Sequence, residues 1–442
     1  MASTTALPRW KTSVLFGGDV RAQGRVLRPL VVASLCAAAY APALDNGFVS
    51  DDYVVLEWIR QWREDPTFLL KLAPDVFRIT SYLILGALKA VFGYRAEWFY
   101  GFAILLHFVN SMLLWKLAAR LTGSARVGFL AASLFAVVQN PQEAIMWLAA
   151  MGDALAALCV LGALLLWLEN RFVLAALVFT AGLFSKESAA VLLVLVPLTE
   201  FCVHGGVAPR RRHLYLLPPT LLFAAVFLWT CSHNYMITNG TYTFGARALA
   251  VWVVSAHRVL FPWGYVAAAL LVTTRRALPV KLSVPLAWII LCLAPYVFLA
   301  QGSHVPSRHT YLASMGLAVG VALTIAELRS VRLARALVWT FVAVNVAYLW
   351  RVKDGQFEVR AAPTTRLVER LADLQPGNIR VVGFPLLPGM ATTATRLVPG
   401  WEPSMVLVDT EPESCPECPE LRWEPATATY LLADAKGAPS IY

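Results

Sequence analysis

Apolar stretches separated by short polar breaks recur along the first 350 residues of the chain. An apolar helix needs roughly 20 residues to cross a bilayer upright, and several of these stretches are shorter. The pattern predicts a polytopic, all-α membrane region with about eleven membrane-spanning helices. We expect these helices near residues 27–44, 98–118, 127–139, 144–168, 172–184, 187–203, 214–231, 248–272, 283–300, 311–328 and 336–350.

The composition agrees with a membrane protein. Of 442 residues, 58% are hydrophobic and only 14% are charged, which is more apolar surface than one soluble core could bury. Ala41-Pro42-Ala43 after the first apolar run matches a signal-peptidase pattern, but a long segment precedes the run and many spans follow. We therefore interpret the first span as an uncleaved signal anchor.

Basic residues gather in every second loop between the predicted spans, and they also precede the first one. The positive-inside bias places residues 1–26 in the cytoplasm as an N-terminal segment, and it places residues 45–97 and the C-terminal region outside. The formal net charge of +10 therefore reports topology and contact with anionic membrane lipid. The arginines are divided among short loops, so we expect no nucleic-acid binding. The sequence does not distinguish a plasma or inner membrane from a eukaryotic endoplasmic reticulum.

Two regions outside the spans carry structure of their own. In the outer loop, residues 45–97, charged and apolar residues alternate at helical spacing, which predicts amphipathic helices at the outer interface. The transmembrane domain is expected to cover 27–350. After about residue 351, proline, glycine and charge return. A small α/β domain over 351–442 is predicted, with a helix and three short strands at 362–374, 380–384, 405–408 and 428–433.

Cys415 and Cys418 lie in this C-terminal region. One Cys-x-x-Cys without a second pair or nearby histidines is weak support for zinc, and the predicted external location favours a disulfide. Two free thiols are the alternative.

The adjacent carboxylates Asp51 and Asp52 follow directly after the first predicted span. Two such charges beside a membrane are costly unless they meet a cation, a polar ligand or water. The pair therefore indicates a functional site.

Short motifs follow one another in a fixed order over about residues 30–330. They are Asn46-Gly47-Phe48-x-x-Asp51-Asp52, Arg78-Ile79-Thr80-Ser81, Phe92-Gly93, Leu106-His107-x-x-Asn110, Phe135-Ala136, Glu143-Ala144-x-x-Trp147, Ser185-Lys186-Glu187-Ser188 and Arg308-His309-x-Tyr311-Leu312-x-Ser314. With this set the chain resembles the membrane half of the C-type glycosyltransferases, above all the transmembrane O-mannosyltransferases that carry tetratricopeptide repeats and their bacterial relatives. The resemblance implies a fold of a dozen or so helices, an active site at the outer face, and a polyprenyl-phosphate monosaccharide as donor, with mannose as a candidate sugar.

The resemblance also implies that an aspartate of the first outer loop acts as the base of this hexosyltransferase. Glycosyl transfer with inversion needs one carboxylate to take the acceptor's hydroxyl proton and a cationic or metal-assisted environment for the departing phosphate. Adjacent residues point in different directions, so we assign the base to Asp51 and expect Asp52 to orient the acceptor or to cap the following helix. The alternative is that both only cap a helix.

The donor phosphate needs cations at the outer ends of the spans. Arg308 is the first choice, because a guanidinium grips phosphate with two parallel bonds. The full set of donor-binding candidates is Arg308, His309, Lys186, Glu187 and Arg78, and a second tier comprises Glu143, Asp153 and Tyr311. We expect Asp153 about three turns inside a span, where it needs a partner.

The metal, the acceptor and the rival functions stay open. Oxygen ligands at Asp51, Asp52 and Glu143 suit Mg²⁺ or Mn²⁺, but the sequence does not decide whether a metal takes part. The chain departs from the family at Val138-Gln139 and Met151, and no repeats follow its spans. The resemblance therefore does not tell whether the acceptor is a protein, a glycan or a lipid. The alternative function is a non-catalytic scaffold or a lipid-binding or transport protein with the same fold.

Overall fold

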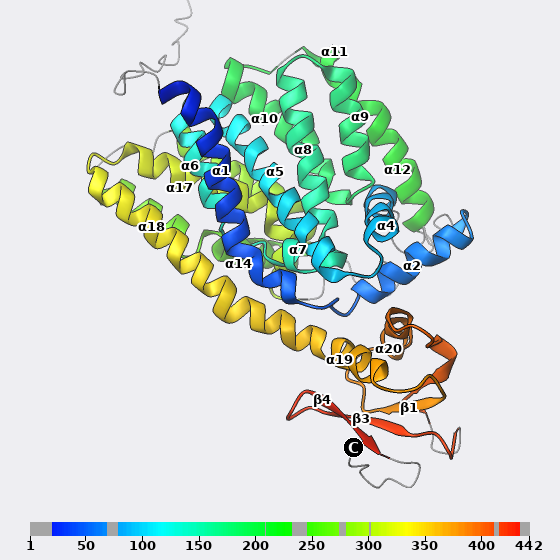
Figure 1. Cartoon of the computed structure of the whole chain (residues 1–442). Coiled ribbons are helices and arrows are strands. Elements are labelled where there is room, and N and C mark those ends of the chain that lie inside the picture. Colours follow the sequence, from blue (N-terminus) through cyan, green and yellow to red (C-terminus); the bar gives the residue numbers. More distant parts are fainter. Residues whose placement is uncertain are drawn as a thin grey trace, which may run out of the picture.

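The computed structural model describes residues 20–68, 78–207, 209–231, 245–273, 280–299, 302–410 and 415–433. It shows a bundle of helices with a small mixed sheet at one end (Figure 1). The start of α1 and the short helix α11 lie at one end of the bundle, whereas α2 and the sheet lie at the other (Figure 1). The segment Asn239-Gly240-Thr241, which matches a glycosylation acceptor, falls outside the described residues.

The helices of the first half contain the outer loop and the first spans. They are α1 (Val20–Tyr40), η1 (Ala41–Asp45), α2 (Asp52–Glu64), α4 (Ile79–Phe92), α5 (Ala96–Thr122), α6 (Ala125–Phe135), α7 (Glu143–Met146), η2 (Leu148–Ala150), α8 (Gly152–Leu168), α9 (Phe172–Leu183), η3 (Glu187–Val191) and α10 (Leu192–His204). Helix α2 confirms an amphipathic helix between the first two spans, whereas α4, the second helix there, is apolar.

The second half completes the bundle and leads into the C-terminal region. Its helices are α11 (Arg210–His213), η4 (Leu214–Leu216), α12 (Leu217–Cys231), α14 (Arg247–Leu260), α15 (Trp263–Thr273), α16 (Val280–Leu293), η5 (Ala294–Tyr296), η6 (Ser307–Thr310), α17 (Tyr311–Glu327), α18 (Val331–Tyr348), η7 (Leu349–Lys353, a π-helical turn), α19 (Asp354–Ala372), α20 (Pro388–Ala394), η8 (Thr395–Leu397) and η9 (Pro403–Met405).

Among the described residues, seven helices are long and apolar enough to cross a membrane, and the bent pair α14 and α15 is an eighth candidate. Four shorter apolar helices accompany them: Ile79–Phe92, Ala125–Phe135, Phe172–Leu183 and Leu282–Tyr296. The last three fall on predicted spans near 127–139, 172–184 and 283–300. The fold class expected from the pattern, an all-α polytopic membrane protein with a small C-terminal α/β region, is confirmed.

Three local expectations were wrong. The single span near 248–272 is broken, because α14 and α15 meet at an angle of 76° where Phe261 and Pro262 interrupt the helical hydrogen bonds. Asp153 is not three turns inside a span, since extended backbone at Trp147 and the turn η2 precede it and α8 begins only at Gly152. The helix expected at 362–374 does not begin there, because α18 continues through η7 into α19 as one helical stretch from Val331 to Ala372.

Helix α17, with the η6 turn before it, is the most buried of the candidate membrane-spanning helices. Most of its residues are buried, and a Cβ added at Gly316 would lie only 2.8 Å from the carbonyl oxygen of Pro285 in α16. Glycine at this position therefore allows α16 and α17 to pack closely. The N-terminal end of α17 follows η6, so this packing also holds the turn that carries Arg308.

The C-terminal sheet has the strand order β2-β1-β3-β4. Its strands are β1 (Ile379–Val382), β2 (Val406–Val408), β3 (Glu420–Glu424) and β4 (Thr429–Ala433). Strand β1 pairs in parallel with β2 and β3, and β3 pairs antiparallel with β4, with Trp423 opposite Tyr430. The three strands expected here are confirmed, and the expected helix belongs to α19. Strand β3 was missed, because it alternates charged residues with Leu421 and Trp423, and only these two are buried.

This region packs on the outer loop through both apolar and charged contacts. Val54 of α2 lies against its core, and Arg396 Nε lies 3.1 Å from Glu57 Oε2, also on α2. Cys415 and Cys418 form a disulfide with a Cα–Cα distance of 5.4 Å, as the sequence predicts. The C-terminal region is thereby held at the end of the bundle where the Asp51 loop lies (Figure 1).

Candidate active site

The loop between η1 and α2 packs against α19. Asn46 Nδ2 donates to Asp354 Oδ1 at 3.2 Å. A Cβ added at Gly47 would collide with the hydroxyl of Thr365, so the glycine allows the loop to approach α19. Phe48 is buried. The three residues Asn-Gly-Phe thus fix the position of the aspartates that follow.

Asp52 is fully buried, and its carboxylate ties this loop to the bundle. Its Oδ2 accepts hydrogen bonds from the backbone N–H of Val49 at 2.8 Å and from the hydroxyl of Tyr100 at 3.3 Å. Its Oδ1 accepts the N–H of Ala149 at 2.7 Å. Burial raises the pKa of Asp52 to about 7, although the two backbone hydrogen bonds act in the opposite direction. No face of this side chain is open to an acceptor.

Asp51, the N-cap residue of α2, is exposed, and its side chain makes no capping hydrogen bond. Within the described residues its carboxylate makes no hydrogen bond or ion pair. Neighbouring atoms withdraw it partly from water, which raises the pKa of Asp51 above its usual value, while the attraction of Arg308 and Arg360 lowers it. The carboxylate therefore lies near enough to be attracted by two guanidinium groups, one from η6 and one from α19.

Both guanidinium groups lie over the indole ring of Trp147. The Cζ atoms of Arg308 and Arg360 are 5.0 Å and 4.4 Å from the ring centroid. Arg308 also contacts Glu143, whose Oε2 accepts from its backbone N–H at 3.2 Å and from Nη1 at 3.3 Å. Arg360 makes no ion pair in the described part of the chain, and the buried indole N–H of Trp147 has no hydrogen-bond partner. This cluster can accept a proton at Asp51 and bind an anion between the arginines.

Lys186, Asp153 and His309 lie in a second, closed cluster. The ammonium of Lys186 contacts Asp153 Oδ2 and lies 3.2 Å from His309 Nδ1. His309 Nδ1 is 3.3 Å from Asp153 Oδ1, and Tyr296 donates to the same oxygen at 2.8 Å while its ring stacks on the imidazole. All four side chains are buried. Their charges are satisfied within the chain.

The remaining candidates also have internal partners. Arg78 Nη2 lies 3.1 Å and 3.2 Å from the two carboxylate oxygens of Glu187. The hydroxyl of Tyr311 is buried between His107 Nδ1 at 2.7 Å and Asn110 Nδ2 at 3.1 Å. Tyr311 thus belongs to the helix packing and not to the Asp51 cluster.

The residues considered for a metal do not form a metal site. Among the described residues, no group of three or more histidine, cysteine, aspartate or glutamate side chains is arranged to hold a metal ion. Asp52 uses both oxygens for hydrogen bonds within the loop, and Glu143 contacts Arg308. We therefore derive no step through a metal.

Sequence reasoning missed Arg360. Its helix was expected to begin at residue 362, after a change of composition that suggested a separate domain. Pro363 lies inside α19 and reinforces that interpretation, because proline usually stands near a helix end. Following the helical period without a break from Val331 would have brought Arg360 to the end of the bundle that holds the Asp51 loop.

Comparisons with known proteins identify the architecture. No family model and no curated protein matches the sequence. Among solved structures, ArnT from Cupriavidus metallidurans bound to undecaprenyl phosphate aligns with a TM-score of 0.57 and 13% identity over 94% of this chain and 97% of ArnT. The apo state of the same ArnT aligns with a TM-score of 0.51 and 14% identity over 92% and 94%. An oligosaccharyltransferase from Archaeoglobus fulgidus reaches a TM-score of only 0.44 at 11% identity over 90% and 65%.

The match to ArnT covers nearly the full length of both chains. Its low identity means that it shows the fold and not the chemistry. The chain shares the polytopic helical fold of ArnT. It is similar to ArnT in the arrangement of its helices.

Proposed function

We propose that this chain is a membrane glycosyltransferase that moves a sugar from a polyprenyl-phosphate donor to an acceptor hydroxyl. One observation carries the proposal: the unpaired carboxylate of Asp51 lies near enough to be attracted by Arg308 and Arg360, and both arginines lie over Trp147. The shared fold with a structure of ArnT bound to undecaprenyl phosphate supports a polyprenyl-phosphate donor. A hexose donor, mannose in particular, is proposed from the motif resemblance.

In the proposed reaction, Asp51 takes the proton from the acceptor hydroxyl as that oxygen attacks the anomeric carbon. A new glycosidic C–O bond forms while the bond between the sugar and the phosphate oxygen breaks, and its electron pair stays on the phosphate. Arg308 and Arg360 stabilise the additional negative charge on the departing polyprenyl phosphate. The raised pKa of Asp51 makes it a stronger base than an ordinary aspartate.

The closed cluster positions these groups and does not contact substrate in this proposal. His309 follows Arg308 directly in η6, so its contacts with Lys186 and Asp153 fix the turn that presents Arg308. Asp52 fixes the Asp51 loop in the same way through Val49 and Ala149. Arg78 and Glu187 support the outer ends of α4 and α10 nearby.

We also propose that the active site and the C-terminal region face the outside. Alkaline phosphatase fused after Gln375 should be active, whereas a fusion after Arg212 should be inactive and a cytoplasmic reporter there active. An active phosphatase after Arg212 would invert this orientation.

The direct test is sugar transfer by the purified protein in liposomes. Polyprenyl phosphates carrying different radiolabelled hexoses should each be offered with membrane extracts as a source of acceptor. We expect label to move to an extractable acceptor with the parent protein and roughly 10²–10⁴-fold more slowly with Asp51→Asn, the loss typical of a general base. Glu97→Gln, which removes an exposed carboxylate of the same loop, is the matched control. Equal transfer by the parent and Asp51→Asn would favour a scaffold.

A further inference from the structure

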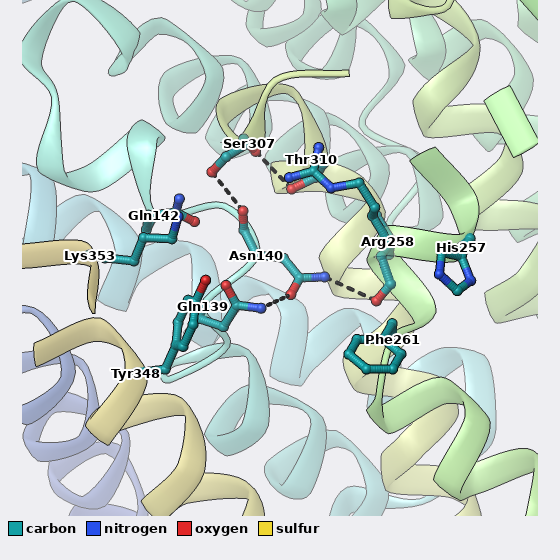
Figure 2. Close-up of a pocket in the computed structure, with 11 residues that line it drawn as sticks. Gln139, Asn140, Gln142, His257, Arg258, Phe261, Ser307, Thr310, Tyr348 and Lys353 are labelled. Carbon is teal, nitrogen blue, oxygen red and sulfur yellow. Dashed lines mark hydrogen bonds between the residues drawn. The ribbon is translucent and has the colours of Figure 1, made fainter. Parts of the chain in front are cut away.

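A polar cavity of about 200 Å³ shares the η6 turn with the candidate active site, and Figure 2 shows its lining residues. Four segments that are distant in sequence line it: the turn before α7, the end of α14 with Phe261, the η6 turn, and the end of α18 with η7. The volume far exceeds the roughly 30 Å³ that one water molecule occupies. It is smaller than the pockets of about 300 Å³ or more that hold drug-sized ligands. A group the size of one sugar fits this range.

Amide side chains line one side of the cavity, and a cationic side chain lies on each of two sides. Figure 2 shows Gln139 and Gln142 near Lys353, with Arg258 across the cavity. The hydroxyls of Ser307 and Thr310 lie between them, and no carboxylate is among the lining residues. Amides and hydroxyls both donate and accept hydrogen bonds, as sugar hydroxyls do.

Both cations donate to neutral oxygens, although the charge of Glu143 also attracts Arg258. Arg258 Nη1 donates to the carbonyl oxygen of Val305 at 3.3 Å, and Lys353 Nζ donates to Gln356 Oε1 at 3.0 Å. Neither forms an ion pair in the part of the chain that the structure describes. An exposed arginine and a half-buried lysine that line one cavity without a carboxylate favour a negatively charged occupant.

Three residues that line the cavity directly precede, in the sequence, residues of the candidate active site or of its support. Ser307 precedes Arg308, and Gln142 precedes Glu143, the partner of Arg308. Lys353 precedes Asp354, which binds Asn46 of the Asp51 loop. An occupant of the cavity therefore lies next to the groups that carry the proposed chemistry, but it uses other cations.

We propose that this cavity binds the head group of the acceptor, and that this head group is a phosphorylated sugar. The assignment rests on the proposed function, in which Arg308 and Arg360 already hold the donor's phosphate. It narrows the acceptor to a glycan or glycolipid with an anionic sugar, because a neutral serine or threonine side chain would offer no negative charge to Arg258 and Lys353.

Equilibrium binding of mannose 1-phosphate to the purified protein tests the proposal. Binding is measured with polyprenyl phosphate at saturation, so that the donor's phosphate site is filled. We expect mannose 1-phosphate to bind, and Arg258→Gln and Lys353→Gln each to weaken binding by about tenfold, the effect of one charged hydrogen bond. Arg335→Gln, an exposed arginine at the other end of α18, should bind like the parent. Methyl mannoside, which lacks the phosphate, should bind at least tenfold more weakly.

Three outcomes would overturn the proposal. They are no binding by the parent at millimolar mannose 1-phosphate, complete displacement by polyprenyl phosphate, and unchanged affinity in both cavity variants. Displacement would assign the cavity to the donor instead. Because the measurement needs no turnover, its result is independent of whether Asp51 is the base. Transfer by Asp51→Asn tests that point separately.

Discussion

Two clusters of charged side chains meet at the η6 turn, and they differ in how their charges are satisfied. Around Asp153, the ammonium of Lys186 and the ring of His309 are buried and in contact with the carboxylate. Around Asp51, the carboxylate is exposed, and Arg360 has no ion pair among the described residues. The first cluster is complete without a ligand, and the second is not.

The difference shows why charge in a membrane protein is a poor guide to function by itself. A buried pair adds little net stability, but the loss of one partner leaves an uncompensated charge. An unpaired group at a surface costs little when its ligand is absent and becomes useful when the ligand binds. We call the group of Asp51, Arg308 and Arg360 the open cluster. Substitutions in the closed cluster should lower the stability of the fold, and substitutions in the open cluster should lower activity.

The largest expected effect on stability comes from Lys186→Met. The change leaves Asp153 buried without its cation, which should destabilise the fold by about 3–5 kcal/mol. Chemical denaturation of the detergent-solubilised protein measures the loss. Arg360→Met is the control from the open cluster, and it should lower stability by less than about 1 kcal/mol. Similar losses in the two variants would remove the distinction between the clusters.

Conservative changes of Arg308 and Arg360, which stack on Trp147, should mainly weaken binding of the donor. Lysine keeps the charge but loses the two-pronged grip, so Arg308→Lys and Arg360→Lys should raise the KM for the polyprenyl-phosphate sugar by roughly tenfold to a hundredfold. Arg335→Lys is the matched control. A lowered melting temperature with an unchanged KM would assign these arginines to structure.

The pH dependence of stability reports on Asp52, the buried neighbour of the open cluster. Its pKa is raised from 3.8 to about 7, so between these values the unfolded chain releases a proton that the folded chain retains. This contribution is complete below pH 4 and is lost as the pH rises toward 7, with a slope of at most about 1.4 kcal/mol per pH unit. Asp52→Asn should flatten the slope in denaturation curves taken from pH 4 to 8. An unchanged slope would show that Asp52 titrates normally.

The apolar pattern predicted most of the fold, because hydrophobic periodicity reports directly on burial in a bilayer or a sheet. The strand over 429–433 and the helices of the outer loop follow from it. The pattern does not report backbone geometry, and so the bend at Phe261 and Pro262 was missed. It also misses partly solvated strands such as Glu420–Glu424, whose alternate residues are charged.

The candidate site was predicted only in part for a related reason. Asp51 and Arg308 stand out as charges at the ends of apolar runs. Arg360 stands in a charged stretch, where one more arginine carries no signal. Only the fold shows that α19 returns to the Asp51 loop and that Lys186, equally prominent in the sequence, already has a partner.

The most direct test of the division between the clusters compares Asp51→Asn with Lys186→Met in the same liposomes. Turnover with saturating donor and the melting temperature are measured for each variant. We expect Asp51→Asn to lower turnover roughly 10²–10⁴-fold at an unchanged melting temperature. Lys186→Met should instead lower the melting temperature. Full turnover by Asp51→Asn, or a fall in its melting temperature as large as that of Lys186→Met, would contradict the role of Asp51 as the base of an open, ligand-binding cluster.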